Sequence, residues 1–268
     1  MISALSPSPS DKATSHSTRL PKDSSQVAGY PASGESAARG AKPERASAGE
    51  GAVKAVLFDL DGTFADTAPD LAAALNHARA ARRLPPLPLE VLRPQASHGS
   101  RGLLKVGFDI EPGHADYDTL RDIFLDYYAS NICVQTKLFG DTAELVAALE
   151  QRGVKWGIVT NKPHRYTVPL MQALGMASRA ACLVSGDTCT HPKPHPEPML
   201  KACELIGVTP DQCLYLGDDL RDMQAANAAG MRGIIANYGY VSGDASVENW
   251  NAHGSVNKPM ELLAYLTL

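Results

Sequence analysis

The sequence lacks several features that would assign it to a specialised class of protein. No apolar stretch is long enough to span a bilayer. The five cysteines are odd in number and include no C-x-x-C pair, which argues against a disulfide framework or a zinc site and favours a reducing cytoplasm. The formal net charge is only −4, which gives no general attraction to nucleic acid or to an anionic membrane. We therefore expect neither nucleic acid nor a membrane as a partner.

Residues 1–50 lack the hydrophobic periodicity of a folded segment. They are dominated by Ser, Ala, Pro and Gly, and they cannot bury enough apolar surface to offset the entropy that ordering would cost. They contain no continuous apolar run of the kind found in secretory signals, and their scattered acidic residues argue against a transit peptide. We predict a disordered tail, which leaves about 218 of the 268 residues for one large domain or for a core with a smaller insert.

A short apolar run followed by two carboxylates is the stretch around which the chain is organised. Residues 54–58 predict a strand buried on both faces of a parallel sheet. The run ends in Asp59 and Asp61, followed by Gly62, at the strand end where open parallel sheets bind ligands. Two carboxylates one residue apart stay ionised together only with a cation or strong donors between them. The stretch predicts a metal-dependent site, and a solvated turn is the alternative interpretation.

The chain after this strand predicts a helical segment over residues 70–135. A polar loop leads into it, with Thr67 as the expected cap and Pro69 near the first turn. Apolar residues such as Leu71 and Leu75 recur at helical spacing, and no strong strand candidate follows. A helical block between the first strand and the next α/β unit indicates an inserted lid rather than a sheet crossover.

Within this block, residues 93–102 are small and polar. An ordinary interhelical loop is one interpretation of the segment. The other is a part of the lid that contacts substrate, in which Arg101 and His98 reach an anion. We therefore name Ser97 and Arg101 as candidate substrate-binding residues.

From Gly140 the pattern changes to alternating helices and strands. Strands are expected at residues 154–160, 181–184, 212–216 and 232–236. Helices are expected at residues 142–151, 168–174, 198–206, 223–229 and 259–266. Repeated units of this size predict an α/β fold with a doubly wound parallel sheet.

Polar residues follow three of the expected strands and also occupy one stiff loop. The strand-end sets are Asp59 with Asp61, Thr160 with Asn161 and Lys162, and Asp218 with Asp219 and Asp222. Alternating prolines stiffen residues 191–198 and present Lys193 in a fixed direction. Each member has an ordinary alternative: an exposed lysine, a strand-end hydroxyl, or a capped helix start. In a parallel sheet, however, all four sets lie at one edge.

This combination fits phosphoryl transfer. Five carboxylates cannot share so small a volume as anions without a cation, and oxygen ligands favour Mg2+. The metal and Lys193 would hold the phosphoryl oxygens, and the Thr160 hydroxyl would donate to a third oxygen. Asp59 at the strand tip would be the nucleophile, and Asp61 would protonate the leaving alkoxide and then activate water.

These residues resemble the four motifs of the haloacid dehalogenase superfamily of phosphohydrolases. Residues 59–63 match its D-x-D-G-T motif, Thr160 the second motif, Lys193 the third, and residues 217–222 the fourth. The resemblance implies a Rossmann-like core with a small helical cap, as in the phosphoglycolate phosphatase group. It implies Mg2+ bound through the Asp59 carboxylate, the Asp61 backbone carbonyl and Asp218.

In that family the remaining acidic residues, Asp219 and Asp222, would support the metal ligands from behind. Asn161 and Lys162 belong to a stretch similar to the phosphoglycolate phosphatase group, and we expect both to contact substrate. Stretches such as residues 156–163 and 193–198 are similar to a narrower branch, the N-acetylmuramic acid 6-phosphate phosphatases.

The sequence thus predicts a cytoplasmic, Mg2+-dependent phosphatase of a small phosphate ester, either a monomer or a homodimer. Its expected parts are a tail (1–50), a core (51–66 and 140–268) and a helical cap (67–139). The leading substrates are 2-phosphoglycolate and N-acetylmuramic acid 6-phosphate. A phosphosugar mutase is one alternative. A phospho-aspartate signalling switch is the other, although a switch has no use for an added acid/base such as Asp61.

Overall fold

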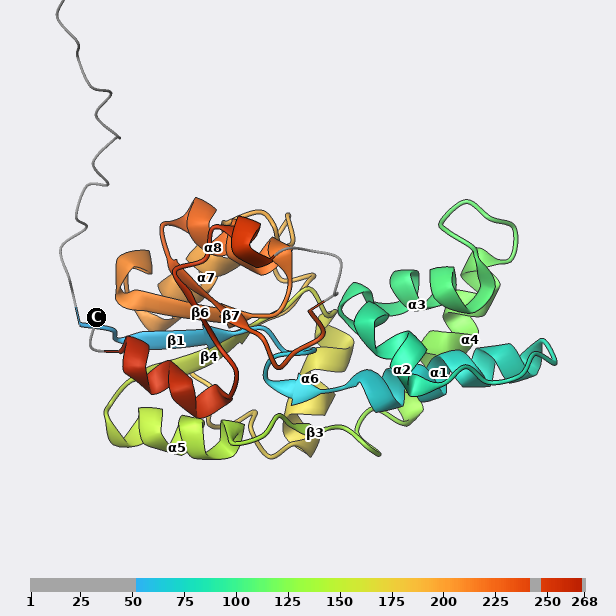
Figure 1. Ribbon diagram of the computed structural model, residues 1–268, viewed down its shortest axis with the longest axis horizontal. Helices are drawn as coiled ribbons and strands as arrows, with labels where there is room; N and C mark the ends of the chain where they lie inside the picture. The colour runs from blue at the N-terminus through green and yellow to red at the C-terminus, as the bar shows by residue number, and fades with distance from the viewer. Residues whose placement is uncertain (1–51, 242–246, 267–268) are drawn as a thin grey trace, which may run out of the picture. The chain divides into compact units, whose positions relative to one another are not determined.

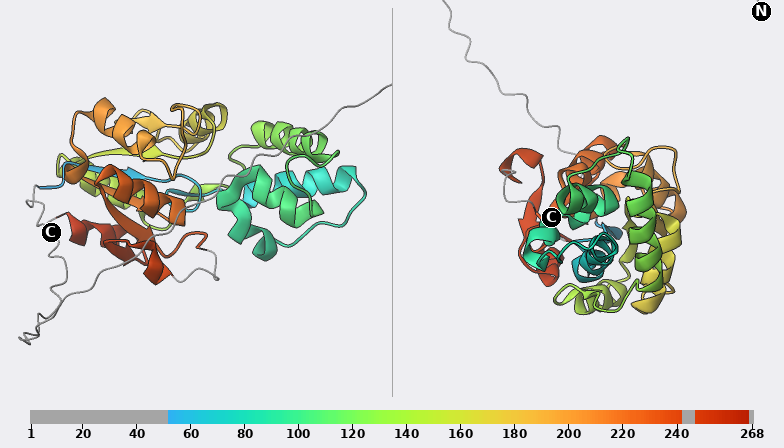
Figure 2. Two further views of the ribbon diagram at one scale, coloured as in Figure 1. Left: turned by 90° about the horizontal axis from the view of Figure 1, so that it is seen from above. Right: turned by 90° about the vertical axis from the view of Figure 1, so that its right-hand side faces the viewer.

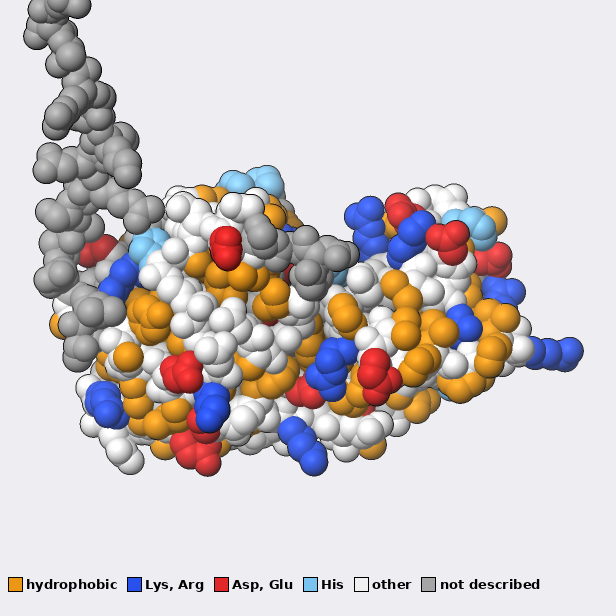
Figure 3. All heavy atoms as spheres, viewed as in Figure 1, with side chains coloured by type: hydrophobic (Ala, Val, Ile, Leu, Met, Phe, Trp, Pro, Cys, Tyr) orange, Lys and Arg blue, Asp and Glu red, His pale blue; other side chains and the backbone are white. Residues whose placement is uncertain are grey.

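The computed structural model describes residues 52–241 and 247–266. The predicted tail, residues 1–50, lies outside the described residues. None of the described helices combines the length and the apolar character that a membrane crossing needs. On the face drawn in Figure 3, the described basic and acidic side chains are interspersed rather than gathered by sign.

A six-stranded parallel sheet forms the core, in the order β5-β4-β1-β6-β7-β8. The strands are β1 (Ala55–Phe58), β4 (Lys155–Val159), β5 (Leu183–Val184), β6 (Cys213–Gly217), β7 (Arg232–Ala236) and β8 (Gly254–Val256). Every residue of β1 is buried, because β1 lies in the middle of the sheet between β4 and β6. The α/β doubly wound fold predicted from the sequence is confirmed.

Alternate residues of β1 face opposite layers of the core, as the pleat of a strand requires. Val56 and Phe58 pack against one set of helices, and Ala55 and Leu57 against another. The first set is α5 (Thr142–Gln151), α6 (His164–Ala173) and the 3₁₀ helix η4 (Pro259–Tyr265). The second set is α7 (Glu197–Ile206) and α8 (Leu220–Ala229). Figures 1 and 2 show helices on both sides of the sheet.

Several element boundaries differ from the sequence prediction. Helix α6 begins at His164 rather than residue 168, and α8 begins at Leu220 rather than residue 223, because their first turns are mostly polar and show no apolar periodicity. The last helix is a 3₁₀ helix. The edge strand β8 was not predicted, since only three residues pair with β7. A two-residue ribbon of β2 (Ala65–Asp66) and β3 (Lys137–Leu138) lies where a loop was expected. Two further 3₁₀ helices are η2 (Pro210–Gln212) and η3 (Val247–Trp250).

The segment predicted to be helical consists of helices with an apolar cluster of their own. The elements are α1 (Ala68–Ala81), α2 (Leu89–Leu92), η1 (Arg93–His98), α3 (Gly99–Phe108) and α4 (Tyr117–Ser130), called the helical insert below. Thr67 occupies the N-cap position of α1 and Pro69 lies in its first turn, as predicted. The Thr67 side chain makes no capping hydrogen bond, however, and donates instead to Asp61 Oδ1 at 2.6 Å.

Asp70 in α1 fixes the point where the chain returns from the helical insert to the core. Its carboxylate is buried and accepts hydrogen bonds from the backbone N–H groups of Val134, Gln135 and Thr136 at 2.9–3.0 Å. It also accepts the Thr136 hydroxyl at 2.7 Å. These residues lead into β3, which pairs with β2 beside Thr67. Removing the carboxylate would leave the two buried donors of Thr136 and two partly buried N–H groups without this acceptor.

We predict that Asp70→Ala lowers the free energy of unfolding by about 3 kcal/mol, measured by urea denaturation, because buried hydrogen bonds to a charge are lost together. The control is Asp122→Ala, which removes an exposed carboxylate from α4 and is expected to change stability by less than about 0.5 kcal/mol. Equal effects of the two substitutions would contradict this role of Asp70.

Candidate active site

Three neighbouring strands bring the predicted motif residues to one edge of the sheet. β4, β1 and β6 are adjacent and parallel, so their carboxyl ends meet at the same edge. Asp59 follows β1, Thr160 follows β4, and Asp218 follows β6. All three side chains are buried. The tight turn after β1 is closed by the Phe64 N–H, which donates to the carbonyl of Asp59 at 3.2 Å.

Three carboxylates lie together at this edge. Oxygen atoms of Asp59, Asp218 and Asp222 are all within 4.8 Å of one another, and all three residues are buried. Burial and the charges of Asp59 and Asp222 raise the pKa of Asp218 well above its ordinary value. Asp59 Oδ1 accepts no hydrogen bond from a described residue. A buried anionic cluster with an oxygen that accepts no hydrogen bond is the environment that a bound cation stabilises.

The residues around Asp218 pack closely against it and hold its carboxylate in place. A Cβ atom at Gly62 would lie 2.2 Å from Asp218 Oδ2, and Gly62 has a positive φ of +88°, so this turn requires glycine. Asp218 accepts hydrogen bonds from the Thr63 hydroxyl and the Tyr240 N–H, both at 2.8 Å. The donors of the cluster are all oxygen atoms, which fits Mg2+.

Lys193 is a buried cation within the carboxylate cluster and not an exposed lysine. Its Nζ lies 2.9 Å from Asp59 Oδ1, in an ion pair without hydrogen-bond geometry, and donates to Asp222 Oδ1 at 2.7 Å. Nζ also donates to the Tyr215 hydroxyl at 2.8 Å. Burial alone lowers the pKa of Lys193, but Asp222 and Asp59 outweigh burial and hold the pKa above its ordinary value. The lysine is therefore charged and faces the nucleophile candidate.

Asn161 holds the loop that carries Lys193. Its side-chain amide donates to the Lys193 carbonyl and accepts the Lys193 N–H, both at 2.9 Å. Asn161 also lines the pocket in front of the site, so its predicted contact with substrate stays a prediction beside this positioning role. Thr160 lies at the end of β4, where its hydroxyl accepts the Lys162 N–H at 3.2 Å.

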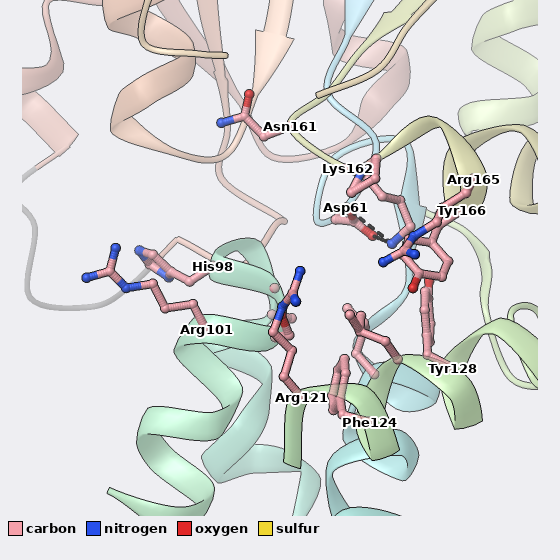
Figure 4. Close-up of a pocket in the computed structure, with 16 residues that line it drawn as sticks. Asp61, His98, Arg101, Arg121, Phe124, Tyr128, Asn161, Lys162, Arg165 and Tyr166 are labelled. Carbon is pink, nitrogen blue, oxygen red and sulfur yellow. Dashed lines mark hydrogen bonds and ion pairs between the residues drawn. The ribbon is translucent and has the colours of Figure 1, made fainter. Parts of the chain in front are cut away.

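Asp61 lies apart from the carboxylate cluster and pairs with Lys162. The Asp61 carboxylate accepts a hydrogen bond from Lys162 Nζ at 2.9 Å, in addition to the one from Thr67. Lys162 is buried, with Nζ 4.6 Å from the ring centroid of Tyr128. Asp61 and Lys162 both line the pocket drawn in Figure 4. The predicted metal contact of Asp61 runs through its backbone carbonyl, so it does not require the carboxylate and stays a prediction.

The fourth motif divides into two kinds of carboxylate. Asp219 is the N-cap of α8, and its side chain accepts the Arg221 N–H at 2.9 Å and an Arg221 guanidinium N–H at 2.7 Å. Burial raises the pKa of Asp219, but Arg221 more than offsets this and holds the pKa below its ordinary value. The helix-start interpretation therefore describes Asp219. Asp222 has both roles, since its Oδ2 accepts the Asp219 N–H at 3.1 Å while Asp218 and Asp222 both belong to the cluster.

The helical insert reaches the cluster through η1. The Ser97 hydroxyl donates to Asp218 Oδ2 at 3.1 Å, and the Ser97 carbonyl accepts an Arg221 guanidinium N–H at 3.0 Å. Arg101 is exposed, with its closest carboxylate partner, Glu111, at 3.9 Å, and it lines the pocket. The structure thus brings Ser97 to the carboxylate cluster and Arg101 to the pocket wall.

Sequence reasoning missed a second group of residues that line the pocket. They come from α4 and α6 and include Arg121, Phe124, Tyr128, Arg165 and Tyr166. Helical periodicity identifies a buried face but does not show which neighbour covers it. No signal in the sequence therefore distinguished these residues from ordinary helix residues.

Comparison with known proteins agrees with the geometry. A family model described as haloacid dehalogenase-like hydrolase matches residues 53–230. The N-acetylmuramic acid 6-phosphate phosphatase of Pseudomonas aeruginosa is 41% identical over 214 residues, covering 80% of this chain and 95% of that protein. The phosphoglycolate phosphatase of Xanthomonas campestris pv. campestris is 43% identical over 212 residues, covering 78% of this chain and 94% of that protein.

Solved structures show the same fold. The crystal structure of a predicted phosphoglycolate phosphatase from Haemophilus somnus matches with a TM-score of 0.72 and 27% identity, covering 81% of this chain and 99% of that chain. These findings confirm the resemblance that the four motifs indicated. The chain belongs to the haloacid dehalogenase-like hydrolases.

Proposed function

We propose that this protein is a Mg2+-dependent phosphatase that hydrolyses the monoester of a small phosphorylated metabolite through an aspartyl-phosphate. The observation that carries the proposal is the buried array of Asp59, Asp218, Asp222 and Lys193, with the Asp61 carboxylate outside it facing the pocket. The enzyme class also rests on the phosphatase names of the relatives.

In this mechanism Asp59 forms the bond to phosphorus, and the neighbouring residues stabilise charge. Asp59 attacks phosphorus and the bond to the leaving oxygen breaks, which leaves the phosphoryl group on Asp59. Lys193 lies 2.9 Å from Asp59 and stabilises charge on the phosphoryl oxygens, with Thr160 donating to another of them. Asp59, Asp218 and the Asp61 carbonyl would hold Mg2+, and Asp222 would support them from behind. When bound, Mg2+ neutralises charge on the transferring phosphoryl group.

Asp61 handles the protons in both halves of the reaction. In its protonated form Asp61 gives its proton to the leaving alkoxide, and the resulting carboxylate takes one from the water that attacks the aspartyl-phosphate, which releases inorganic phosphate and restores both Asp59 and the protonated Asp61. Thr67 and Lys162 fix the direction of its carboxylate through contacts of 2.6 and 2.9 Å. Because the Asp61 carboxylate lies outside the carboxylate cluster, it is available for proton transfer.

The helical insert would act as a cap over the site. The contacts that hold it close to the core include Ser97 with Asp218 at 3.1 Å and Arg93 with Asp66 at 2.7 Å. Closing the cap would exclude bulk water from the phosphoryl group. The substrates we propose are 2-phosphoglycolate or N-acetylmuramic acid 6-phosphate, which the names of the relatives suggest, and a reducing cytoplasm is the proposed compartment.

We predict that Asp59→Asn lowers kcat by at least about 10³-fold, because the amide does not replace the nucleophile. Asp61→Asn is expected to lower kcat by about 10²- to 10⁴-fold while the Mg2+ dependence of the residual rate is retained. Phosphate release measures both effects. Asp211→Asn, an exposed carboxylate before β6, serves as the control. A normal rate from either site variant would remove that residue from the mechanism.

We also predict that a chelator abolishes phosphate release and that added Mg2+ restores it. The panel contains 2-phosphoglycolate, N-acetylmuramic acid 6-phosphate and simple sugar phosphates, each assayed with and without chelator. Phosphate and the free alcohol should appear in equal amounts. Full activity after thorough metal removal would contradict the metal assignment, and an isomerised phosphate ester without phosphate release would identify a mutase instead.

A further inference from the structure

The pocket between the helical insert and the core carries more positive than negative charge. Its described lining includes one carboxylate, that of Asp61. The long cationic side chains that line it are Arg101 from α3, Arg121 from α4, Lys162 from the loop after β4, and Arg165 from α6. Lys162 and Asp61 neutralise each other in their ion pair. The arginines therefore leave an excess of positive charge in the pocket.

Arg121 and Arg165 carry most of this excess, because neither has a hydrogen bond or an ion pair with another described residue. Arg101, by comparison, has Glu111 at 3.9 Å. Arg165 lies over the ring of Tyr166, with its guanidinium carbon 4.7 Å from the ring centroid, so the ring supports the side chain without neutralising it.

The two guanidinium groups act on one region of the pocket. Burial raises the pKa of the Tyr166 phenol, and the charges of Arg165 and Arg121 both oppose that rise. Both arginines therefore lie within electrostatic range of the same hydroxyl. Figure 4 shows Arg121 rising from α4 and Arg165 descending from α6 on either side of the hollow. Phe124 supplies an apolar part of the wall between them.

The phosphoryl group does not need these two arginines. Its charge would be met at the strand ends by Lys193 and by the Mg2+ that the carboxylate cluster would hold, and neither Lys193 nor Asp59 lines this pocket. Asp61 connects the carboxylate cluster with this pocket, since it lines the pocket and follows Asp59 by two residues. An anionic group that satisfies the arginines must therefore belong to the other end of the substrate.

We propose that Arg121 and Arg165 form a subsite for a carboxylate on the substrate, at the end opposite the phosphate. This inference rests on the proposed phosphatase function. Guanidinium groups suit the task because they remain charged and bind a carboxylate through two parallel N–H donors. Both proposed substrates carry a carboxylate, so the subsite applies to either.

The test uses two pairs of phosphate esters that differ in the carboxylate. The first pair is 2-phosphoglycolate and 2-hydroxyethyl phosphate. The second is N-acetylmuramic acid 6-phosphate and N-acetylglucosamine 6-phosphate, which lacks the lactyl ether. The variants are Arg121→Met and Arg165→Met. The matched control is Arg152→Met after α5, where the guanidinium donates to the Ala148 carbonyl at 2.9 Å outside the pocket.

For the carboxylate member of the pair that the enzyme uses, each variant is expected to lower kcat/KM by about 10- to 100-fold, mainly through KM, because a charge-assisted contact is lost. For the member without a carboxylate, the change should stay within about 2-fold, and the control should match the wild type with both. An equal loss with both members, or no loss with either, would overturn the subsite.

Calorimetric titration of the same esters into Asp59→Asn measures binding to the subsite in the absence of turnover. In that background the carboxylate member should bind at least about 10-fold more tightly, and Arg121→Met or Arg165→Met should remove the difference. A preference that is absent, or that persists in both arginine variants, overturns the subsite even if phosphate is released normally. A preference that the arginine variants remove, in an enzyme that releases no phosphate, would overturn the proposed reaction and leave the subsite standing.

Discussion

The burial of three carboxylates at one sheet edge is the constraint on which the site depends. Asp59, Asp218 and Asp222 lie within 4.8 Å of one another, away from the solvent that would screen their repulsion. Lys193 offsets part of this charge, with Nζ at 2.9 Å from Asp59 and 2.7 Å from Asp222. The rest calls for a divalent cation. The sheet holds the arrangement, because β1 and β6 are neighbours in the centre of the core.

Asp61 lies apart from this cluster, so two aspartates that are separated by one residue have different environments. Asp59 faces Lys193 and the other carboxylates, whereas Asp61 is turned toward the pocket by Thr67 and Lys162. A strand tip followed by a tight turn produces this divergence, since Asp59 directly follows β1 whereas Asp61 lies within the turn that the Phe64 N–H closes. The same local geometry therefore supplies a nucleophile candidate and an acid/base candidate.

The helical insert completes a site whose chemistry lies in the core. Ser97 contacts Asp218, and the insert contributes Arg121 to the pocket wall opposite Arg165 of the core. Under the proposed function, residues of the core would face the phosphoryl group, and residues at the boundary would face the remainder of the substrate. This division explains why family membership identifies the reaction more readily than the substrate.

The sequence by itself determined the strands β1, β4, β6 and β7, because buried apolar runs are local signals. It also named Asp59, Asp61, Thr160, Lys193 and Asp218 as candidate site residues, because polar residues that end such runs are local signals too. Tertiary structure alone decided the short pairings of β8 and of β2 with β3 and the use of Asn161 to hold the Lys193 loop. It also decided that Arg121 and Arg165 share a pocket. These features depend on which surfaces meet after folding, and a helical repeat shows that a face is buried without showing what lies against it.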